Sequence, residues 1–170
     1  MFEYYEALGL EPKLALDSDD LRKRFYERSR ESHPDLVGAS SEDRMALLND
    51  AFRTLREPVA RAEYFLKQKG LDLSKEVPPE LLEEVFELNM LLDALRDSDD
   101  SARTQLDAGR EVFAGMQEEI DRDLAALYGA YDADGGFEKL ERIQAVLSRR
   151  RYISNLLRDV DRELNVHLSN

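Results

Sequence analysis

Cysteine and histidine, two residue types that often carry enzyme chemistry, are absent and rare, respectively, in this sequence of 170 residues. There is no cysteine, and the only two histidines, His33 and His167, stand 134 positions apart. Without cysteine the chain can form no disulfide, thiolate metal site or thiol nucleophile. No G-x-S-x-G, phosphate-binding loop or dinucleotide-binding motif occurs. We therefore expect neither an enzyme nor a bound metal or cofactor.

Two acidic patterns resemble functional sites only in part. Residues 132–136 look like the start of a calcium loop, but the sixth position, which requires glycine, is Phe137, and the final glutamate is replaced by Ile143. We interpret this segment as a turn. The carboxylate pairs at 83–84 and 118–119 fall on charge-rich helix faces, which favours solvated surface over acid–base chemistry.

One cluster of polar residues stands out, the tripeptide His33-Pro34-Asp35 preceded by a basic segment. Residues 21–30 contain Glu27 as their one acid and five basic side chains, namely Arg22, Lys23, Arg24, Arg28 and Arg30. A positive stripe beside a stiff polar turn suits an acidic partner surface, because opposite potentials steer encounter. The ordinary alternative is a helix C-terminus with favourable arginines, followed by a turn.

The elements around this tripeptide are predicted to be helices, because apolar residues recur with a period near 3.6 and no useful length alternates with period two. Asp17 or Ser18 should cap the helix that ends before Pro34, and Ser40 with Asp43 should form a capping box for the next. Those two helices should lie antiparallel, with the tripeptide in their connection. The four expected helices cover about 3–8, 18–33, 40–57 and 58–70.

A composition step near residue 70 indicates two domains. Residues 1–70 carry a net charge of −2 and residues 71–170 a net charge of −11. We expect an all-α protein with a first domain at 1–70, a linker at 71–78 and a three-helix bundle at 79–170. The expected helices of the bundle cover about 80–96, 101–128 and 137–167.

Charge and hydropathy exclude further classes of protein. The total charge of −13 argues against a nucleic-acid partner, since phosphate binding needs a basic surface. No apolar run approaches the roughly 18 residues of a membrane span, and the acidic, aromatic N-terminus is unlike a signal or transit peptide. We expect a soluble protein with no membrane partner.

The helix after Pro79 carries more apolar residues than one core face needs. One stripe, sufficient for a core, consists of Leu81, Val85, Leu88, Leu92 and Leu95. A second stripe, about 100° round the helix, consists of Leu82, Phe86 and Met90. Either the helix contacts two neighbours in its bundle, or the second stripe is a partner surface.

Four motifs in a fixed order carry a family resemblance. Residues 4–10, the basic helix with its His-Pro-Asp tripeptide, and residues 48–55 have the order and spacing of a J-domain. Residues 58–66 and the acidic helical tail narrow the choice among J-domain families. With them, the chain resembles the HscB family, which comprises J-domain co-chaperones of bacterial iron–sulfur cluster assembly. The resemblance implies that this domain docks on an ATP-bound, HscA-like chaperone of the DnaK family and triggers ATP hydrolysis. It assigns that role to His33, Pro34, Asp35, Arg22, Arg24, Arg28 and Arg30.

The same resemblance implies that the C-terminal bundle holds an IscU-type scaffold protein. The implied contact residues are Leu82, Phe86, Glu87, Met90 and Tyr152. Two positions depart from the family pattern, Leu36 where J-domains often have a basic residue and Glu83 where the patch is usually apolar. A bacterial, cytoplasmic member fits best, because the extra cysteine motif of eukaryotic relatives and a mitochondrial leader are missing. The alternatives are a general J-domain co-chaperone with a different client, and an enzyme or regulator in which the tripeptide is incidental.

Overall fold

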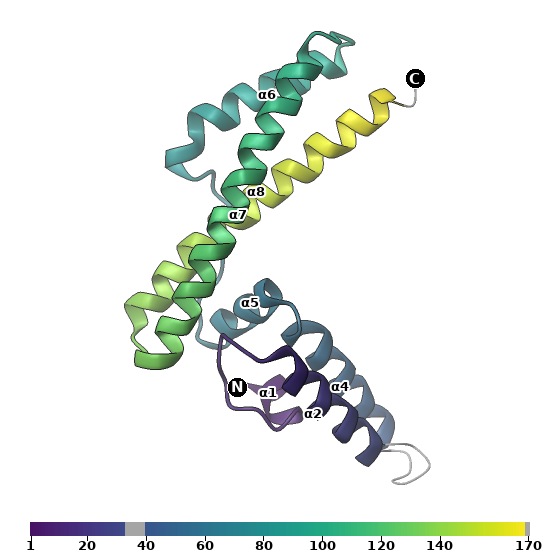
Figure 1. The fold of residues 1–170 in the computed structure, drawn as a ribbon, viewed down its shortest axis with the longest axis vertical. Helices are drawn as coiled ribbons and strands as arrows, with labels where there is room; N and C mark the ends of the chain where they lie inside the picture. Colours follow the sequence, from purple (N-terminus) through teal and green to yellow (C-terminus); the bar gives the residue numbers. More distant parts are fainter. Residues whose placement is uncertain (33–39, 169–170) are drawn as a thin grey trace. The chain divides into compact units, whose positions relative to one another are not determined.

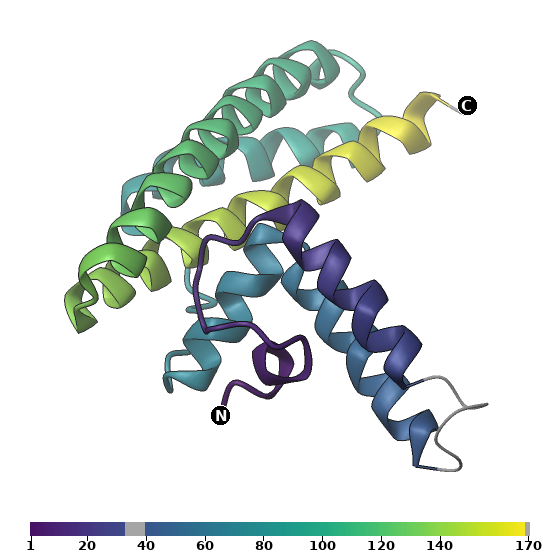
Figure 2. The same ribbon diagram turned by 60° about the horizontal axis from the view of Figure 1, so that its bottom comes forward.

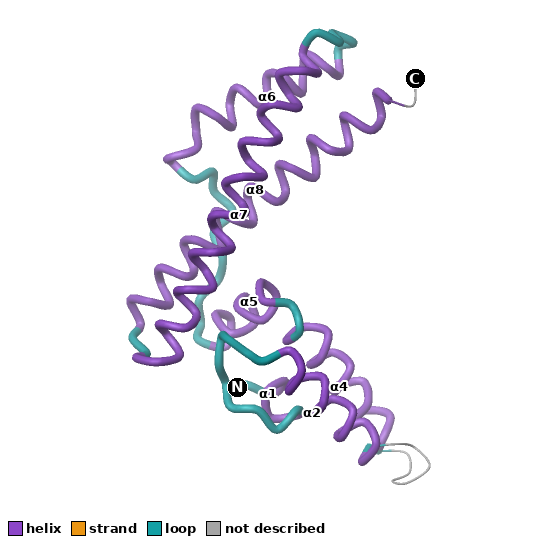
Figure 3. The backbone as a smooth tube through the Cα atoms, in the orientation of Figure 1, coloured by secondary structure: helices purple, strands orange, loops and turns teal. Residues whose placement is uncertain are grey.

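The computed structural model describes residues 1–32 and 40–168 as a set of helices (Figure 1). No strand occurs within these ranges (Figure 3), which confirms the all-α prediction. None of the described helices is both long and apolar enough to cross a membrane. The helices are α1 (Glu3–Ala7), α2 (Ser18–Glu31), α4 (Ser41–Leu55), α5 (Pro58–Gln68), the 3-10 turn η1 (Pro79–Leu81), α6 (Leu82–Arg96), α7 (Ala102–Asp134) and α8 (Phe137–Leu168).

Contacts divide the chain into two compact units. The first comprises residues 1–72 and 125–144, and the second comprises residues 73–124 and 145–170. The adjoining ends of α7 and α8 therefore belong to the first unit, together with α1, α2, α4 and α5. The domain limits that the sequence suggested, at 70 and 79, stay predictions.

The first unit is built around an α2–α4 helical hairpin, in which the two helices run side by side (Figure 2). Phe25 of α2 stacks on Phe52 of α4, with ring centroids 4.3 Å apart. α1 packs on α4, and Tyr5 of α1 and the following Leu8 have no exposed surface. Burial of large apolar side chains from short helices is what makes such a small unit stable.

The two capping predictions have different outcomes. Asp17 caps α2 as expected, since its Oδ1 accepts a hydrogen bond of 2.8 Å from the Asp20 N–H. Ser40 precedes α4 but makes no side-chain capping bond, so the predicted capping box with Asp43 is wrong. Ser40 already has helical backbone angles, φ −73° and ψ −6°, whereas a capping side chain normally sits on an extended residue.

In the second unit, α6 packs with parts of α7 and α8 in a three-helix arrangement. The predicted core stripe of α6 is confirmed, since Leu81, Val85, Leu88, Leu92 and Leu95 are all buried. α6 and α7 approach closely at Gly109, where a Cβ atom would lie 2.7 Å from Leu88 Cδ1. Polar bonds join the helices at the surface, including the Arg110–Asp161 pair between α7 and α8.

The segment predicted as a turn at 132–136 is only partly one. α7 continues to Asp134, past its predicted end near Tyr128, and the reversal occurs at Gly135 and Gly136, whose φ angles are +68° and +102°. Tertiary contacts explain the longer helix: Tyr131 meets the Phe65 ring edge-on at 5.6 Å, and Asp132 binds the 14–15 backbone. Such contacts outweigh the weak helix propensity of Gly129.

Candidate binding surfaces

A basic face runs along the exposed side of α2. Arg22, Tyr26 and Arg30 follow one another at steps of four, which places them on neighbouring positions of one helix face. Both arginines and Lys23 are exposed, and none of the three makes an ion pair within the described residues. Tyr26 is 59% exposed between them, a position that the sequence reasoning did not single out. These uncommitted cations can bind acidic groups of a partner.

The other two predicted arginines of α2 are held by the chain itself. Arg24 Nη1 donates to the Gly9 carbonyl oxygen at 2.6 Å, and its Nε donates to Asp20 at 2.9 Å. Arg28 pairs with Glu31 at 3.5 Å. Gly9 has a φ of +65°, a backbone conformation that favours glycine. Arg24 thus holds the turn after α1 against α2.

The tripeptide itself, His33-Pro34-Asp35, lies outside the described residues. Its assignment to chaperone docking therefore stays a prediction. α2 ends at Glu31 and α4 begins at Ser41, so the tripeptide stands between these two helices in the sequence.

A buried polar cluster supports this unit, and the sequence reasoning missed it. Arg61 of α5 is only 6% exposed, and it donates to the carbonyl oxygens of Leu14 at 2.6 Å and Leu55 at 2.8 Å. Asp132 of α7 accepts from the N–H groups of Leu14 at 2.9 Å and Ala15 at 2.8 Å. The cluster therefore holds the chain between α1 and α2 from two sides. Long sequence separations, 47 and 118 residues from Leu14, left no local signal for it.

Burial shapes the electrostatics of this cluster. Desolvation lowers the pKa of the Arg61 guanidinium from its ordinary value, although the neighbouring Tyr5, Tyr128 and Asp132 act in the opposite direction. Desolvation also raises the pKa of the Tyr5 hydroxyl, which donates to the Lys13 carbonyl oxygen at 2.6 Å. A neutral tyrosine and a charged arginine that donates to two backbone carbonyl oxygens are consistent with a structural role.

The second stripe of α6 forms an exposed apolar face. Leu82, Phe86 and Met90 are 56%, 65% and 59% exposed, respectively. Glu87 is exposed beside them, as is Glu83. The stripe therefore does not contact a second neighbour within its own unit, which removes one of the two sequence-based interpretations. Large apolar side chains clustered on one helix face are typical of a partner surface.

Tyr152 of α8 lines a cavity between α6 and α8 that borders this face. Tyr152 is half-buried, and it shares the lining of this cavity of about 600 Å³ with Asn89, the residue before Met90 on α6. The structure thus places the five predicted scaffold-contact residues on one helix face of α6 and on the α8 segment that shares a cavity with it. The polar residues of that cavity were not identified from the sequence.

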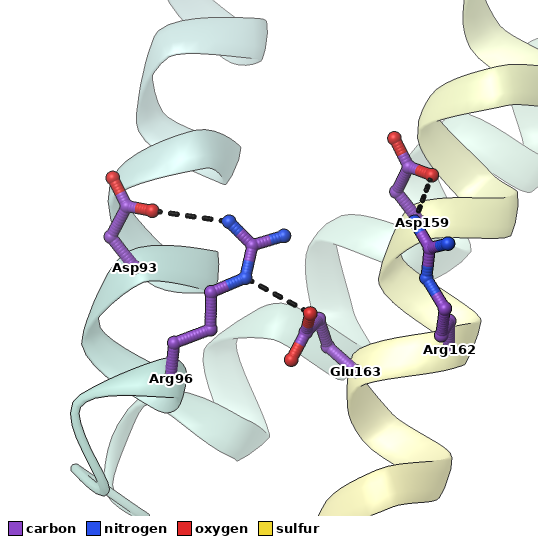
Figure 4. Close-up of polar contacts among 5 residues, drawn as sticks. All are labelled: Asp93, Arg96, Asp159, Arg162 and Glu163. Carbon is purple, nitrogen blue, oxygen red and sulfur yellow. Dashed lines mark hydrogen bonds and ion pairs between the residues drawn. The ribbon is translucent and has the colours of Figure 1, made fainter.

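Ion pairs hold α6 and α8 together at one end of this region (Figure 4). Arg96 of α6 donates from Nε to Glu163 of α8 at 2.9 Å and from Nη1 to Asp93 at 3.3 Å. The hydrogen bond to Glu163 raises the pKa of Arg96 above its ordinary value. On α8 itself, Arg162 donates to Asp159 at 2.8 Å. The positions of α6 and α8 beside the cavity are therefore fixed by both apolar packing and polar bonds.

Comparisons with known proteins agree with this arrangement. The DnaJ domain family matches residues 3–64. A co-chaperone protein HscB homolog of Aliivibrio fischeri is 34% identical over 128 residues, 69% of this chain and 75% of that protein. A homolog of the same name from Shewanella loihica is 28% identical over 170 residues, 94% of this chain and 95% of that protein. The structure of the chaperone HscB from Vibrio cholerae superposes with a TM-score of 0.65 at 26% identity, covering 97% of this chain and 98% of that one. The chain belongs to the HscB family of J-domain co-chaperones.

Proposed function

We propose that this protein acts in iron–sulfur cluster assembly by bringing an IscU-type scaffold protein to an HscA-like chaperone of the DnaK family and stimulating the ATPase of that chaperone. The chain itself performs no chemistry in this proposal. Its first unit activates the chaperone and its second unit binds the client. We place this activity in the bacterial cytoplasm, where the proposed partners would meet it.

One observation carries the proposal beyond family membership, namely the exposed apolar face of α6. This helix already buries four apolar side chains, so Leu82, Phe86 and Met90 are not needed for its own core. Exposure of three large apolar side chains on a single face has a cost in solubility that a binding function explains. Burying the remaining exposed half of each side chain would stabilise a complex by about 1 kcal/mol or more per residue.

The chaperone contact is assigned to the α2 face and to the tripeptide next to it. Arg22 and Arg30 have no partner within the described residues and are free to bind acids of the chaperone. Arg24 contributes mainly by fixing the Gly9 turn beside the helix, and the charge of Arg28 is partly offset by its ion pair with Glu31. His33, Pro34 and Asp35 are proposed to trigger hydrolysis, as the family resemblance implies.

The client assignment is tested by titration calorimetry with the IscU-type scaffold of the same genome. We expect saturable binding by the wild type and at least tenfold weaker binding by Leu82→Ala/Phe86→Ala. Phe137→Ala is a matched control, because Phe137 is 57% exposed and lies outside the α6 face. Absence of wild-type binding to a folded scaffold would favour a general J-domain co-chaperone with another client.

The chaperone assignment is tested by ATPase assays with the DnaK-family chaperone of the same genome. His33→Gln should abolish stimulation, and Arg22→Gln/Arg30→Gln should weaken it in a salt-dependent manner, because these exposed cations act through partner charges. Neither variant should change scaffold binding. Normal stimulation by His33→Gln would contradict the proposal.

A further inference from the structure

The cavity beside the apolar face of α6 has the composition of an anion-binding site. It has a volume of about 600 Å³ and is lined from three parts of the second unit: the segment before η1, α6 and α8. Its polar lining includes Lys75, Asn89, Arg151 and Asn155. Each of these four side chains carries N–H donors, and two carry a positive charge.

All four donor side chains are uncommitted within the described part of the chain. Lys75 and Arg151 form no ion pair there, although most neighbouring arginines of α8 do, including Arg149, Arg150 and Arg162. Asn89 and Asn155 make no side-chain hydrogen bond within the same residues. All four side chains are exposed and line one open cavity, so they are available to a ligand that brings acceptors of its own.

The remaining polar groups do not neutralise the cavity. Asp159 is the only acid in its lining, and its Oδ1 already accepts a bond of 2.8 Å from Arg162 (Figure 4). The wall that carries Lys75 is held in place, because the N–H of Ser74 donates to Ser148 Oγ on α8 at 3.0 Å. The cavity is thus a local basic site on a chain whose total charge is −13.

The cavity is continuous with the apolar face. Asn89 lies three residues after Phe86 and directly before Met90, so the α6 wall of the cavity borders that face. Tyr152 supplies an aromatic ring to the same lining. A partner segment lying on Phe86 and Met90 would therefore carry its neighbouring side chains to the mouth of the cavity.

We propose that the cavity receives a carboxylate side chain of the client, next to the apolar residues that contact α6. Lys75 and Arg151 bind the carboxylate, Asn89 and Asn155 donate additional hydrogen bonds, and Tyr152 packs against the adjoining client segment. This inference rests on the proposed function and adds to it the chemistry by which the client is selected. An apolar face alone accepts many segments, whereas a charge-assisted contact beside it fixes register and rejects segments that lack the acid.

The test compares two double variants of equal charge change in titrations with the IscU-type scaffold. Lys75→Gln/Arg151→Gln removes the two cavity cations, and Arg122→Gln/Arg158→Gln removes two exposed arginines that do not line the cavity. Each titration is run at about 50 and about 300 mM NaCl, because screening weakens a charge contact and leaves an apolar one. Circular dichroism verifies that the variants keep their helix content.

We expect the cavity variant to bind about five- to tenfold more weakly at low salt, with a flatter salt dependence, and the control variant to bind within about twofold of the wild type. A client whose bound carboxylate is replaced by the corresponding amide should bind the wild-type protein about five- to tenfold more weakly. The cavity variant should then weaken the binding of that client no further. Equal effects of the two double variants, or no effect of either, would overturn the inference.

The outcomes also separate this inference from the function on which it rests. Scaffold binding that is lost in Leu82→Ala/Phe86→Ala but unchanged in Lys75→Gln/Arg151→Gln supports the proposed function and refutes the carboxylate site. Wild-type protein that binds no scaffold at either salt concentration refutes both. The cavity variant could also bind the scaffold more weakly while no acid-to-amide change in the client reproduces that loss. This result would indicate a free anion in the cavity and would also refute the inference.

Discussion

Replacing Asp132 by alanine measures what the end of α7 contributes to the first unit. The carboxylate accepts two charge-assisted hydrogen bonds, from the N–H of the buried Leu14 and from the more exposed N–H of Ala15. Water can replace the second bond, but the Leu14 N–H would lose its acceptor in a partly buried place. We expect a loss of about 2 kcal/mol in the stability of this unit, most of it from Leu14.

Asp134 provides the matched control. It lies in the same last turn of α7, is exposed and makes no hydrogen bond within the described residues. A negative charge near a helix C-terminus is unfavourable, so either substitution relieves the same repulsion, and the difference between the two variants isolates the bonds to residues 14 and 15. Asp132→Ala should therefore unfold more easily in urea than Asp134→Ala.

Amide hydrogen exchange gives the local readout for this prediction. A loss of about 2 kcal/mol corresponds to roughly 30-fold faster exchange of the Leu14 amide, together with the amides that open with it. Amides within α6 should keep their wild-type rates, because they belong to the other unit. Asp132→Ala and Asp134→Ala variants that agree within about 0.5 kcal/mol would refute the reasoning.

Other predictions concern packing and pH. Gly109→Ala should destabilise the second unit by about 1 kcal/mol, because the new Cβ would lie 2.7 Å from Leu88 Cδ1 and the cost of repacking exceeds the gain in helix propensity. Gly115→Ala should stabilise the same unit by about 0.5–1 kcal/mol, because no atom lies within 4 Å of its new Cβ. Urea unfolding measures both changes. Tyr5 has a pKa raised by burial, so the folded state holds its proton more tightly than the unfolded chain, whose tyrosine titrates near 10.0. The stability that Tyr5 provides is therefore complete below pH 10 and falls above it by up to about 1.4 kcal/mol per pH unit. Urea unfolding from pH 8 to pH 11 should show a flatter decline for Tyr5→Phe, and an unchanged slope would contradict this assignment.

Local sequence signals predicted the helices well and their ends less well. Asp17 could be identified as a cap because its role depends on Asp20, three residues away. The end of α7 was placed too early, because the contacts that extend it past Gly129 come from Phe65 and from the chain at Leu14. Periodicity describes how a helix presents its faces, but it contains no information on a partner that is distant in sequence.

The candidate surfaces, too, were predictable from the sequence only in part. The second stripe of α6 was visible in the sequence, because a helix of that length needs one apolar face and this one has two. The structure argues against burial on a second neighbour, because it leaves Phe86 and its neighbours exposed, and the partner surface stays a prediction. The basic stripe of α2 was also visible, but sequence could not separate Arg22 and Arg30, which make no ion pair within the described residues, from Arg24, which binds the Gly9 carbonyl oxygen, and Arg28, which pairs with Glu31.

The two surfaces differ in physical character, and this difference makes their roles separable. The α2 face is charged and hydrated, so it should govern association rate and depend strongly on salt. The α6 face is apolar, so it should govern the lifetime of its complex and depend little on salt, except through the cations at Lys75 and Arg151. The two surfaces share no residue and belong to different compact units. Variants at the two surfaces should therefore combine additively in assays that require both, whereas direct coupling between chaperone and client binding would make the double variant depart from that sum.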